Sequence, residues 1–437
     1  MIKRHVGVGW GVLLLLGGVA GRTEEMNDRF LALEARQKAL EDKLAAQPVV
    51  TAGKDGFALK SADGAFALKF FGDVQVDGRF YLDDDANKYT DKILLRRLRP
   101  TFEMVGFNKL TARLQPNFGG TGTSFSLDDA YLDYKASSLA TFRAGRYKPP
   151  VGLENLQSSV RTTFIERSLA TNLVPVYDVG AQLHGGVVEG KINYAISVSN
   201  GAPDGEVVAT DSADGKEVSG RLFVQPMKGS KSIWGELGLG ISASTAREFG
   251  TNSAPKLPAG FKTEGQENFF KYRYAVAQGA HQRVSPQILW YVGSLGFMGE
   301  HVSSYQTVRA TATATNVNML NQAWQLAFSY VLTGESPSYK GLKPAKNFDP
   351  AKNEWGALEL AGRVSRFTVD DDAFDYSIAD TTDYAREARA WTGGINWYPN
   401  AFFKIMANYT YTGFSGGAAS GDRRPERALF LRTQVAF

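Results

Sequence analysis

The sequence between residues 66 and 81 reads Phe66-Ala-Leu-Lys-Phe-Phe-Gly-Asp-Val-Gln-Val-Asp-Gly-Arg-Phe-Tyr81. Its even positions are apolar or glycine, whereas most odd positions from Lys69 to Arg79 are polar or charged. Successive side chains of a β-strand point to opposite faces of the sheet, so a period of two indicates a strand. This segment therefore predicts a long strand with one apolar face and one polar face.

The same alternation recurs as far as the last residue of the chain. It is clearest in Leu110–Phe118, Lys191–Asn200 and Ala428–Phe437. Between Lys54 and Phe437 we count about 16 strand-like segments, or roughly 24 residues for each strand with its connection, which suits membrane-spanning strands of ~10 residues. The repeat therefore predicts an all-β protein of many similar strands.

The connections between these segments alternate in length. Short ones lie at Asn108-Lys109, Ser137-Ser138, Gly190-Lys191 and Pro399-Asn400. Longer polar ones lie at Asp83–Lys92, Gly201–Glu217, Ala246–Gly265, Thr333–Glu354 and Gly413–Glu426. This pattern is typical of an outer-membrane barrel, which has tight periplasmic turns and long outside loops.

The alternative fold is a soluble β-sandwich, whose apolar faces pack together in a dry core. About 16 strands with charged second faces would need two such cores, and no linker divides the chain after Lys54. A closed barrel avoids this, because its apolar face meets lipid and its backbone groups are all paired. We therefore predict a transmembrane antiparallel β-barrel over residues 49–437, preceded by a short N-terminal coiled-coil helix.

The first twenty residues have the pattern of an export signal. Lys3, Arg4 and His5 form a positive start, Val6–Val19 is apolar, and Gly18-Val19-Ala20 supplies small residues for cleavage. The apolar run is shorter than the ~20 residues that a membrane-spanning helix needs. We interpret residues 1–20 as a cleaved signal peptide, with a retained anchor helix as the alternative.

Residues 21–48 form a separate charged segment with a helical period. Its seam has spacings of 4, 3, 4, 3 and 4, which is an a/d pattern of about three heptads, and Pro48 ends it. The seam consists of Met26, Phe30, Leu33, Gln37, Leu40 and Leu44. One interpretation is a periplasmic coiled coil that helps an oligomer assemble, and the other is a lone amphipathic helix.

Composition excludes several classes of function. The formal net charge of +4 is too balanced for a nucleic-acid coat, so no nucleic-acid partner is expected. The chain has no cysteine, which excludes thiol nucleophiles and cysteine-bound metals. Three histidines remain after the predicted signal, and Gly334-Glu-Ser-Pro-Ser338 lacks the second glycine of a nucleophile elbow. We expect no enzyme activity, no metal and no cofactor.

Positive charge is concentrated between Ile93 and Arg167, where 11 basic residues face six acidic ones. Alternation turns Arg97 and Arg99 toward the lumen. Arg96 has the lipid-facing parity, so it must sit at a bulge or strand end, or the register is off by one. The irregular segment Lys148–Leu173 is expected to fold into the barrel and narrow it.

Clustered guanidinium groups favour anions, and their planar fork suits oxyanions such as phosphate. The alternative is that these charges are solvated or pair with Asp128, Asp129 and Glu166. The predicted anion-binding and pore-lining residues are Arg96, Arg97, Arg99, Arg113, Arg143, Arg146, Arg161 and Arg167.

Several short motifs together resemble the phosphate-selective porin O/P family of Gram-negative outer membranes. They are Phe66-Ala-Leu-Lys-Phe-Phe-Gly72 with Gln75, Leu95-Arg-Arg-Leu-Arg99, Phe142-Arg-Ala-Gly-Arg-Tyr147, Gly152-Leu-Glu154, Glu166-Arg167, Leu332-Thr-Gly-Glu335, Gly394-Ile-Asn-Trp-Tyr398 and Phe437. The resemblance implies a 16-stranded barrel, a homotrimer, and one pore per chain with an inner constriction loop.

The resemblance also implies roles for single residues. Arg96 and Arg97 match the paired arginines of the basic zone, and Arg143 and Arg167 match two further basic positions. The sequence departs from the family where Asp73 replaces an arginine and Arg99 a tyrosine. It departs again at two loop positions that often hold lysine, Asn155 and Val160.

We therefore expect an outer-membrane channel for passive diffusion of anions, with phosphate or polyphosphate preferred. Its expected partners are inorganic phosphate or other small anions, the lipid bilayer with its lipopolysaccharide, and two further copies in a homotrimer. The alternatives are a general or other-solute porin on the same barrel, and a barrel that serves as a structural or adhesive surface protein.

Overall fold

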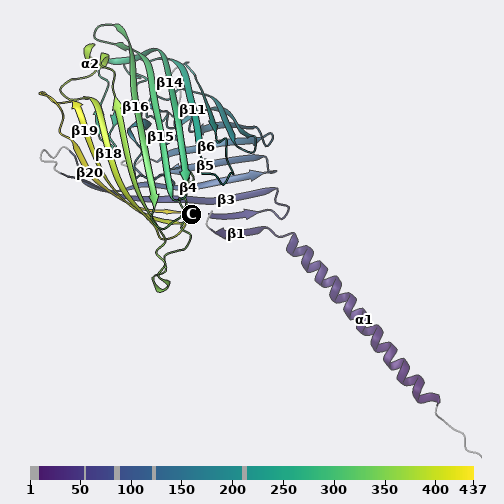
Figure 1. The fold of residues 1–437 in the computed structure, drawn as a ribbon. Helices are drawn as coiled ribbons and strands as arrows, with labels where there is room; N and C mark the ends of the chain where they lie inside the picture. Colours follow the sequence, from purple (N-terminus) through teal and green to yellow (C-terminus); the bar gives the residue numbers. More distant parts are fainter. Residues whose placement is uncertain (1–8, 54–55, 83–88, 121–124, 209–213) are drawn as a thin grey trace, which may run out of the picture.

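The computed structural model describes residues 9–53, 56–82, 89–120, 125–208 and 214–437. Sixteen antiparallel strands form a closed barrel, as the sequence predicts (Figure 1). These strands are β3 (Phe66–Tyr81), β4 (Lys92–Gly106), β5 (Leu110–Asn117), β6 (Ser126–Lys135), β7 (Thr141–Tyr147), β8 (Asp178–Val187), β9 (Ile192–Ser199), β10 (Glu217–Val224), β11 (Gly238–Phe249), β14 (Ala275–Val292), β15 (Leu295–Ala310), β16 (Thr315–Val331), β17 (Ala357–Thr368), β18 (Ala385–Tyr398), β19 (Phe403–Gly416) and β20 (Glu426–Ala436).

The remaining elements are small. A hairpin of β1 (Val49–Gly53) and β2 (Gly56–Lys60) precedes the barrel, and β12 (Phe261–Lys262) pairs with β13 (Asn268–Phe270) inside a loop. The short helices are η1 (Leu169–Leu173), η2 (Pro350–Lys352) and α2 (Asp372–Asp375).

The alternation in β3 has the predicted effect on its two faces. Asp73, Gln75 and Asp77 point inward and are at most 5% exposed, whereas outward-facing Phe66 and Leu68 are 49% and 42% exposed. An apolar outer face is what hydrocarbon requires, and pairing on both edges leaves no free strand edge.

The barrel closes where β20 pairs with β3, from Ala428 opposite Tyr81 to Ala436 opposite Asp73. Phe437 continues this pairing, because its backbone N–H and C=O both bond to Gly72. Its ring packs against Phe57 and Phe70, with centroids 6.4 and 5.8 Å away. The terminal aromatic therefore covers the junction where β2 replaces β20 beside β3.

Helix α1 (Gly9–Ala45) extends away from the barrel (Figure 1). The apolar members of its predicted seam are 53–69% exposed. Residues 1–8, which hold the positive start of the predicted signal, lie outside the described residues, and the signal stays a prediction. Within the described chain, no helix combines the length and apolar character needed to cross a membrane.

The connection at Thr333–Glu354 lies at the opposite end from the one predicted. It joins the end of β16 to the start of β17, and both lie at the end of the barrel that holds Phe437 and the short turns. That end is the periplasmic one in outer-membrane barrels. The prediction was wrong because it judged the side by loop length alone, whereas strand parity decides it.

The expectation of an inner face that is polar throughout was also wrong in one region. On the inner wall of β15 to β18, many side chains in the extracellular half are apolar. They pack against Phe261, Phe269 and Phe270, which belong to the long connection between β11 and β14 and are at most 1% exposed. This connection, predicted to be an outer polar loop, folds into the barrel, because burying each phenylalanine contributes about 1.5–3 kcal/mol.

Candidate anion pore

Residues 148–177, which we call the constriction loop, contain the predicted segment Lys148–Leu173, fold into the barrel and are bonded to several strands. The backbone N–H groups of Leu153 and Glu154 donate to the Glu300 carboxylate of β15 at 2.6 and 3.0 Å. Ile165 N–H donates to Asn408 Oδ1 of β19, four strands further along the sheet, at 2.7 Å. Arg99 of β4, seven strands from β15, donates to the Ser159 hydroxyl, so the loop is fixed across the lumen.

The loop separates two chambers. The periplasmic chamber has a volume of about 730 Å³ and reaches Ala436 and Phe437. The extracellular chamber has a volume of about 290 Å³ and reaches Gly205 and Lys262 of the outer loops. The residues that line both chambers mark their boundary, which we call the waist; they are Arg99, Lys148, Ser159 and Tyr177.

Both chambers have an excess of positive charge. Six basic and two acidic residues line the extracellular chamber, a net charge of +4. Eight basic and three acidic residues line the periplasmic chamber, a net charge of +5. Seven of the eight predicted arginines lie here: Arg96, Arg97 and Arg167 in the extracellular chamber, Arg113, Arg143 and Arg161 in the periplasmic one, and Arg99 at the waist.

A β-bulge explains the parity of Arg96. Gln75 pairs with Arg97, and the next residue, Val76, pairs with Leu95, so Arg96 has no partner across the ladder. A bulge re-aims side chains, and the Arg96 side chain reaches Glu166 at 2.7 Å. Two consecutive arginines therefore serve one chamber. Of the options left open by the sequence, the bulge is the one observed.

Arg146 lines neither chamber, in contrast to the prediction. It stands at the end of β7, after Gly145, whose φ is +127° and whose added Cβ would lie 2.3 Å from the Ala130 carbonyl oxygen. The guanidinium donates to the Val208 carbonyl at 2.7 Å. Loop residues after β9 therefore cover this arginine.

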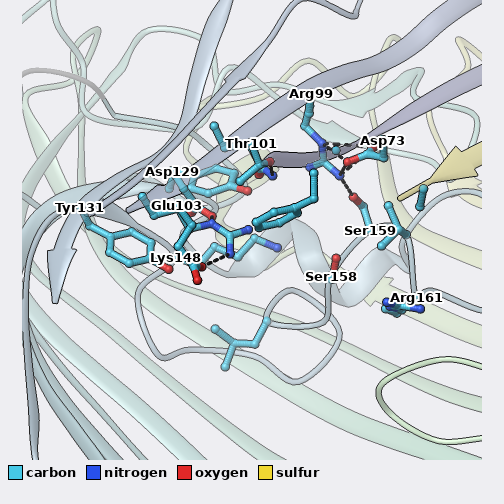
Figure 2. A pocket seen from close by; sticks show the side chains of 18 of the residues that line it. Asp73, Arg99, Thr101, Glu103, Asp129, Tyr131, Lys148, Ser158, Ser159 and Arg161 are labelled. Carbon is cyan, nitrogen blue, oxygen red and sulfur yellow. Dashed lines mark hydrogen bonds and ion pairs between the residues drawn. The ribbon is translucent and has the colours of Figure 1, made fainter. Parts of the chain in front are cut away.

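Besides Arg96 with Glu166, three more of the lumen arginines are paired with carboxylates, as the alternative interpretation proposed. Arg113 lies 3.1 Å from Asp129, and Arg143 lies 2.7 Å from Asp133. Arg99 lies 2.9 Å from Asp73, its partner across the β3–β4 ladder. Asp73 and Arg99 are thus a matched pair across the ladder (Figure 2).

Arg99 has two further contacts at the waist. It lies 3.4 Å from Asp128 and donates to the Ser159 hydroxyl of the constriction loop. A guanidinium shared by two carboxylates retains little net charge for a passing anion. Arg99 therefore joins wall and loop more than it supplies free positive charge.

Three other cations near the waist donate only to neutral acceptors among the described residues. Arg97 donates to Gln75 Oε1 at 2.8 Å, and Lys148 donates to the Asn155 carbonyl at 2.6 Å. Arg167 donates to the Gln157 carbonyl at 2.9 Å. Because carbonyl oxygens carry no formal charge, these contacts leave the cations without a neutralising carboxylate.

Sequence reasoning did not single out Lys148, although it lies in the basic segment and directly follows β7. Burial, together with Arg167 and Arg99 nearby, holds the pKa of Lys148 well below its ordinary value. An anion beside it would offset the two arginines and favour the charged ammonium. The protonation of the Lys148 amine therefore responds to anion binding.

Glu166 is the main counter-charge on the extracellular side. Burial alone would raise its pKa, but Arg96 and Arg79 hold the pKa well below its usual range. It lies 2.5 Å from Arg79 and 3.7 Å from Arg432. This carboxylate stays ionised and neutralises part of the cluster around it.

The fold and the charged lumen define an outer-membrane porin. Residues 68–437 match the family described as phosphate-selective porin O and P, and the chain belongs to this family. Porins are channels and not enzymes, and the protein is placed in the Gram-negative outer membrane.

Several known proteins are similar to the chain. Porin O of Pseudomonas aeruginosa is 24% identical over 394 residues, which are 83% of this chain and 86% of that protein. The outer-membrane channel DcaP of Acinetobacter baumannii has a TM-score of 0.56 at 13% identity, covering 89% of this chain and all of that one. An anion-selective porin from Comamonas acidovorans has a TM-score of 0.53 at 11% identity, with 85% and 100% covered.

Proposed function

We propose that this porin is a passive diffusion channel for anions, with phosphate or polyphosphate as the preferred solute. The observation that carries the proposal is the charge near the waist, where Arg97, Lys148 and Arg167 donate to neutral acceptors only, as far as the structure describes the chain. An anion in this zone exchanges water for several cationic donors at once, inside a low-dielectric wall. The family name and an anion-selective structural neighbour support the same reading.

Passage runs from the extracellular chamber through the waist into the periplasmic chamber. Arg97 and Arg167 attract the anion in the first chamber, where Arg96 is paired with Glu166, and Lys148 lines both chambers. A site must bind firmly enough to admit an ion and weakly enough to release it. Without the shared Arg99 and Lys148, the two chamber linings carry net charges of +2 and +3, which favour entry from either side without a single deep trap.

We also propose that the channel is a homotrimer. The strands β5 to β10 have only 7 to 10 residues, whereas β14 to β16 have 16 to 18. An eight-residue tilted strand is about 20 Å tall, less than the ~25 Å apolar band of such barrels. The short strands β5 to β10 are covered if they face neighbouring copies, while the long strands β14 to β16 face lipid and lipopolysaccharide. OmpT of Vibrio cholerae, with a TM-score of 0.51, is described in a trimer form.

Planar-bilayer recordings of the purified protein test the proposal. Millimolar phosphate should block the chloride current. Arg97→Ala should raise the half-blocking concentration about tenfold, as expected for the loss of one charged hydrogen bond. Arg143→Gln is the matched control and should change the block little, because Arg143 is already paired with Asp133. Equal effects of the two substitutions, or cation selectivity of the wild type, would contradict the assignment.

A second candidate is a porin with little phosphate preference. The pairing of Arg99, Arg113 and Arg143 with carboxylates favours it, because these groups contribute little free charge. It predicts a chloride current that phosphate does not reduce. The same recordings therefore separate the two candidates.

A further inference from the structure

Apolar side chains line part of the periplasmic chamber. Phe71 has the inward parity of β3, between Lys69 and Asp73, and is only half-buried. Leu156 and Val160 of the constriction loop, also half-buried, line the same chamber. A lumen that carries only hydrated inorganic ions gains nothing from such groups, since apolar surface in water is unfavourable.

Structural contacts account for only part of this surface. The guanidinium carbon of Arg113 lies 5.3 Å from the centre of the Phe71 ring, a cation–π contact that leaves the side chain partly exposed. Val160 is held through its backbone, where its carbonyl accepts from Gln434 at 3.0 Å. The side chains of Phe71 and Val160 thus remain available to a solute.

Cations stand beside this apolar surface. Arg161 directly follows Val160 and lines the chamber (Figure 2), as does Lys343 of the periplasmic loop. Within the part of the chain that the structure describes, neither has a carboxylate within ion-pair distance. The chamber therefore offers unpaired positive charge and apolar contact together.

We propose that the periplasmic chamber is a binding site for organic anions that combine a carboxylate with an aromatic or other apolar body. The proposal rests on the proposed anion channel and specifies a solute class for it. The apolar body packs against Phe71, Leu156 and Val160, and the carboxylate faces Arg161 and Lys343. The volume of about 730 Å³ is within the range of ligand-sized sites.

The wild-type channel tests this proposal without any substitution. Benzoate and acetate have the same charge and the same carboxylate, and they differ in the ring. Benzoate added on the periplasmic side should half-block the chloride current at about a tenfold lower concentration than acetate, which corresponds to about 1.4 kcal/mol. Neutral benzyl alcohol should block less than benzoate, because it lacks the charge.

Equal block by benzoate and acetate would overturn the organic-anion site. If phosphate still blocked in that case, the proposed anion channel would stand and only this inference would fail. Loss of anion selectivity altogether would instead remove the proposed function on which the inference rests. Block by benzyl alcohol as strong as that by benzoate would also overturn the inference, since the cations would then have no role.

Substitutions test whether the preference for benzoate over acetate arises in the periplasmic chamber. Phe71→Gln should remove most of the preference for benzoate over acetate, whereas Phe71→Leu should retain part of it. Phe142→Leu is the control, because Phe142 is on the outer face and is 53% exposed. Arg161→Gln should weaken block by both carboxylates to a similar extent. A benzoate preference unchanged in Phe71→Gln would place the binding elsewhere and contradict the proposal.

Discussion

Asp73 and Arg99 face each other on neighbouring strands. A buried carboxylate beside an arginine neutralises much of its charge. The basic residues that line the chambers therefore include two groups. One group is paired with acids, and it consists of Arg96, Arg99, Arg113 and Arg143. The other group donates to neutral acceptors, and it consists of Arg97, Lys148 and Arg167.

Removing the charge of Asp73 should free Arg99 from its ion pair and strengthen anion binding at the waist. In Asp73→Asn the guanidinium keeps Asp128 at 3.4 Å and loses its main partner. We expect phosphate to block chloride current at about a tenfold lower concentration, since a hydrogen bond to a charged group is worth about 1.5–3 kcal/mol. Asp133→Asn, which releases Arg143 away from the waist, is the matched control. A weaker phosphate block in Asp73→Asn would show that Asp73 supports the site.

Lys148 should make anion binding depend on pH. Its pKa lies below the ordinary value, so the ammonium is lost at a lower pH than usual and is regained as pH falls. Block by sulfate, which stays a dianion at neutral and alkaline pH, should therefore strengthen as the pH falls from the ordinary lysine pKa of about 10.4 toward neutrality. Bilayer recordings of Lys148→Arg provide the comparison, because arginine stays charged throughout. A pH dependence that persists in Lys148→Arg would assign it to another group.

At the scale of elements, the strands were predictable, whereas the inward fold of the connection between β11 and β14 was not. A period of two gave the bounds of β3 as Phe66–Tyr81, which are the bounds observed, and β5 ends one residue before the predicted Leu110–Phe118. Periodicity reports only that two faces differ. Inward-facing Val317 and Met319 of β16 are apolar because a distant loop covers them, and local alternation carries no sign of that loop.

The candidate site likewise has features that the sequence predicts and features that it does not. The positive charge of the lumen and the inward course of the constriction loop follow from composition and parity. The pairing of Asp73 with Arg99 needs the cross-strand register, and the role of Phe71 needs the position of the constriction loop. Neither can be read from one strand, so the sequence predicted where charge gathers and not which cations stay unpaired.

Phe261, Phe269 and Phe270 form an apolar plug inside the outer half of the barrel, and this plug should contribute to stability. Phe269 is fully buried there, so Phe269→Ala should lower the free energy of unfolding by about 3–5 kcal/mol. The resistance of the folded barrel to heat and urea, followed by gel mobility, measures this. Phe142→Ala on the lipid-facing surface should cost less in detergent. Equal losses would mean that the plug is not packed as described.

Helix α1 should act in assembly and not in conduction. Its exposed seam residues, among them Leu33 and Leu40, have the spacing of a coiled coil, and the helix extends away from the barrel. Leu33→Asp with Leu40→Asp should lower the temperature at which trimers dissociate, measured by crosslinking. Single-channel conductance should stay the same. Lys38→Asp, off the seam, is the control, and equal sensitivity of both variants would favour a lone helix.

At the scale of the whole molecule, the sheet of the barrel faces three environments. Its outer apolar face meets lipid. Its inner face on β15 to β18 packs against the apolar plug, and its inner face on β3 to β7 borders the charged chambers. The plug fills part of the lumen, so solutes are confined to the basic side. Selectivity therefore follows from where the loops fold as much as from which residues the strands carry.

The most direct test of an anion-selective pore is the zero-current potential across a bilayer that separates two concentrations of potassium chloride. The positive waist predicts a potential whose sign reports chloride as the more permeant ion, and a smaller value when Arg97, Lys148 and Arg167 are all replaced by glutamine. A potential that reports potassium as the more permeant ion, or one that the triple substitution leaves unchanged, would contradict the account.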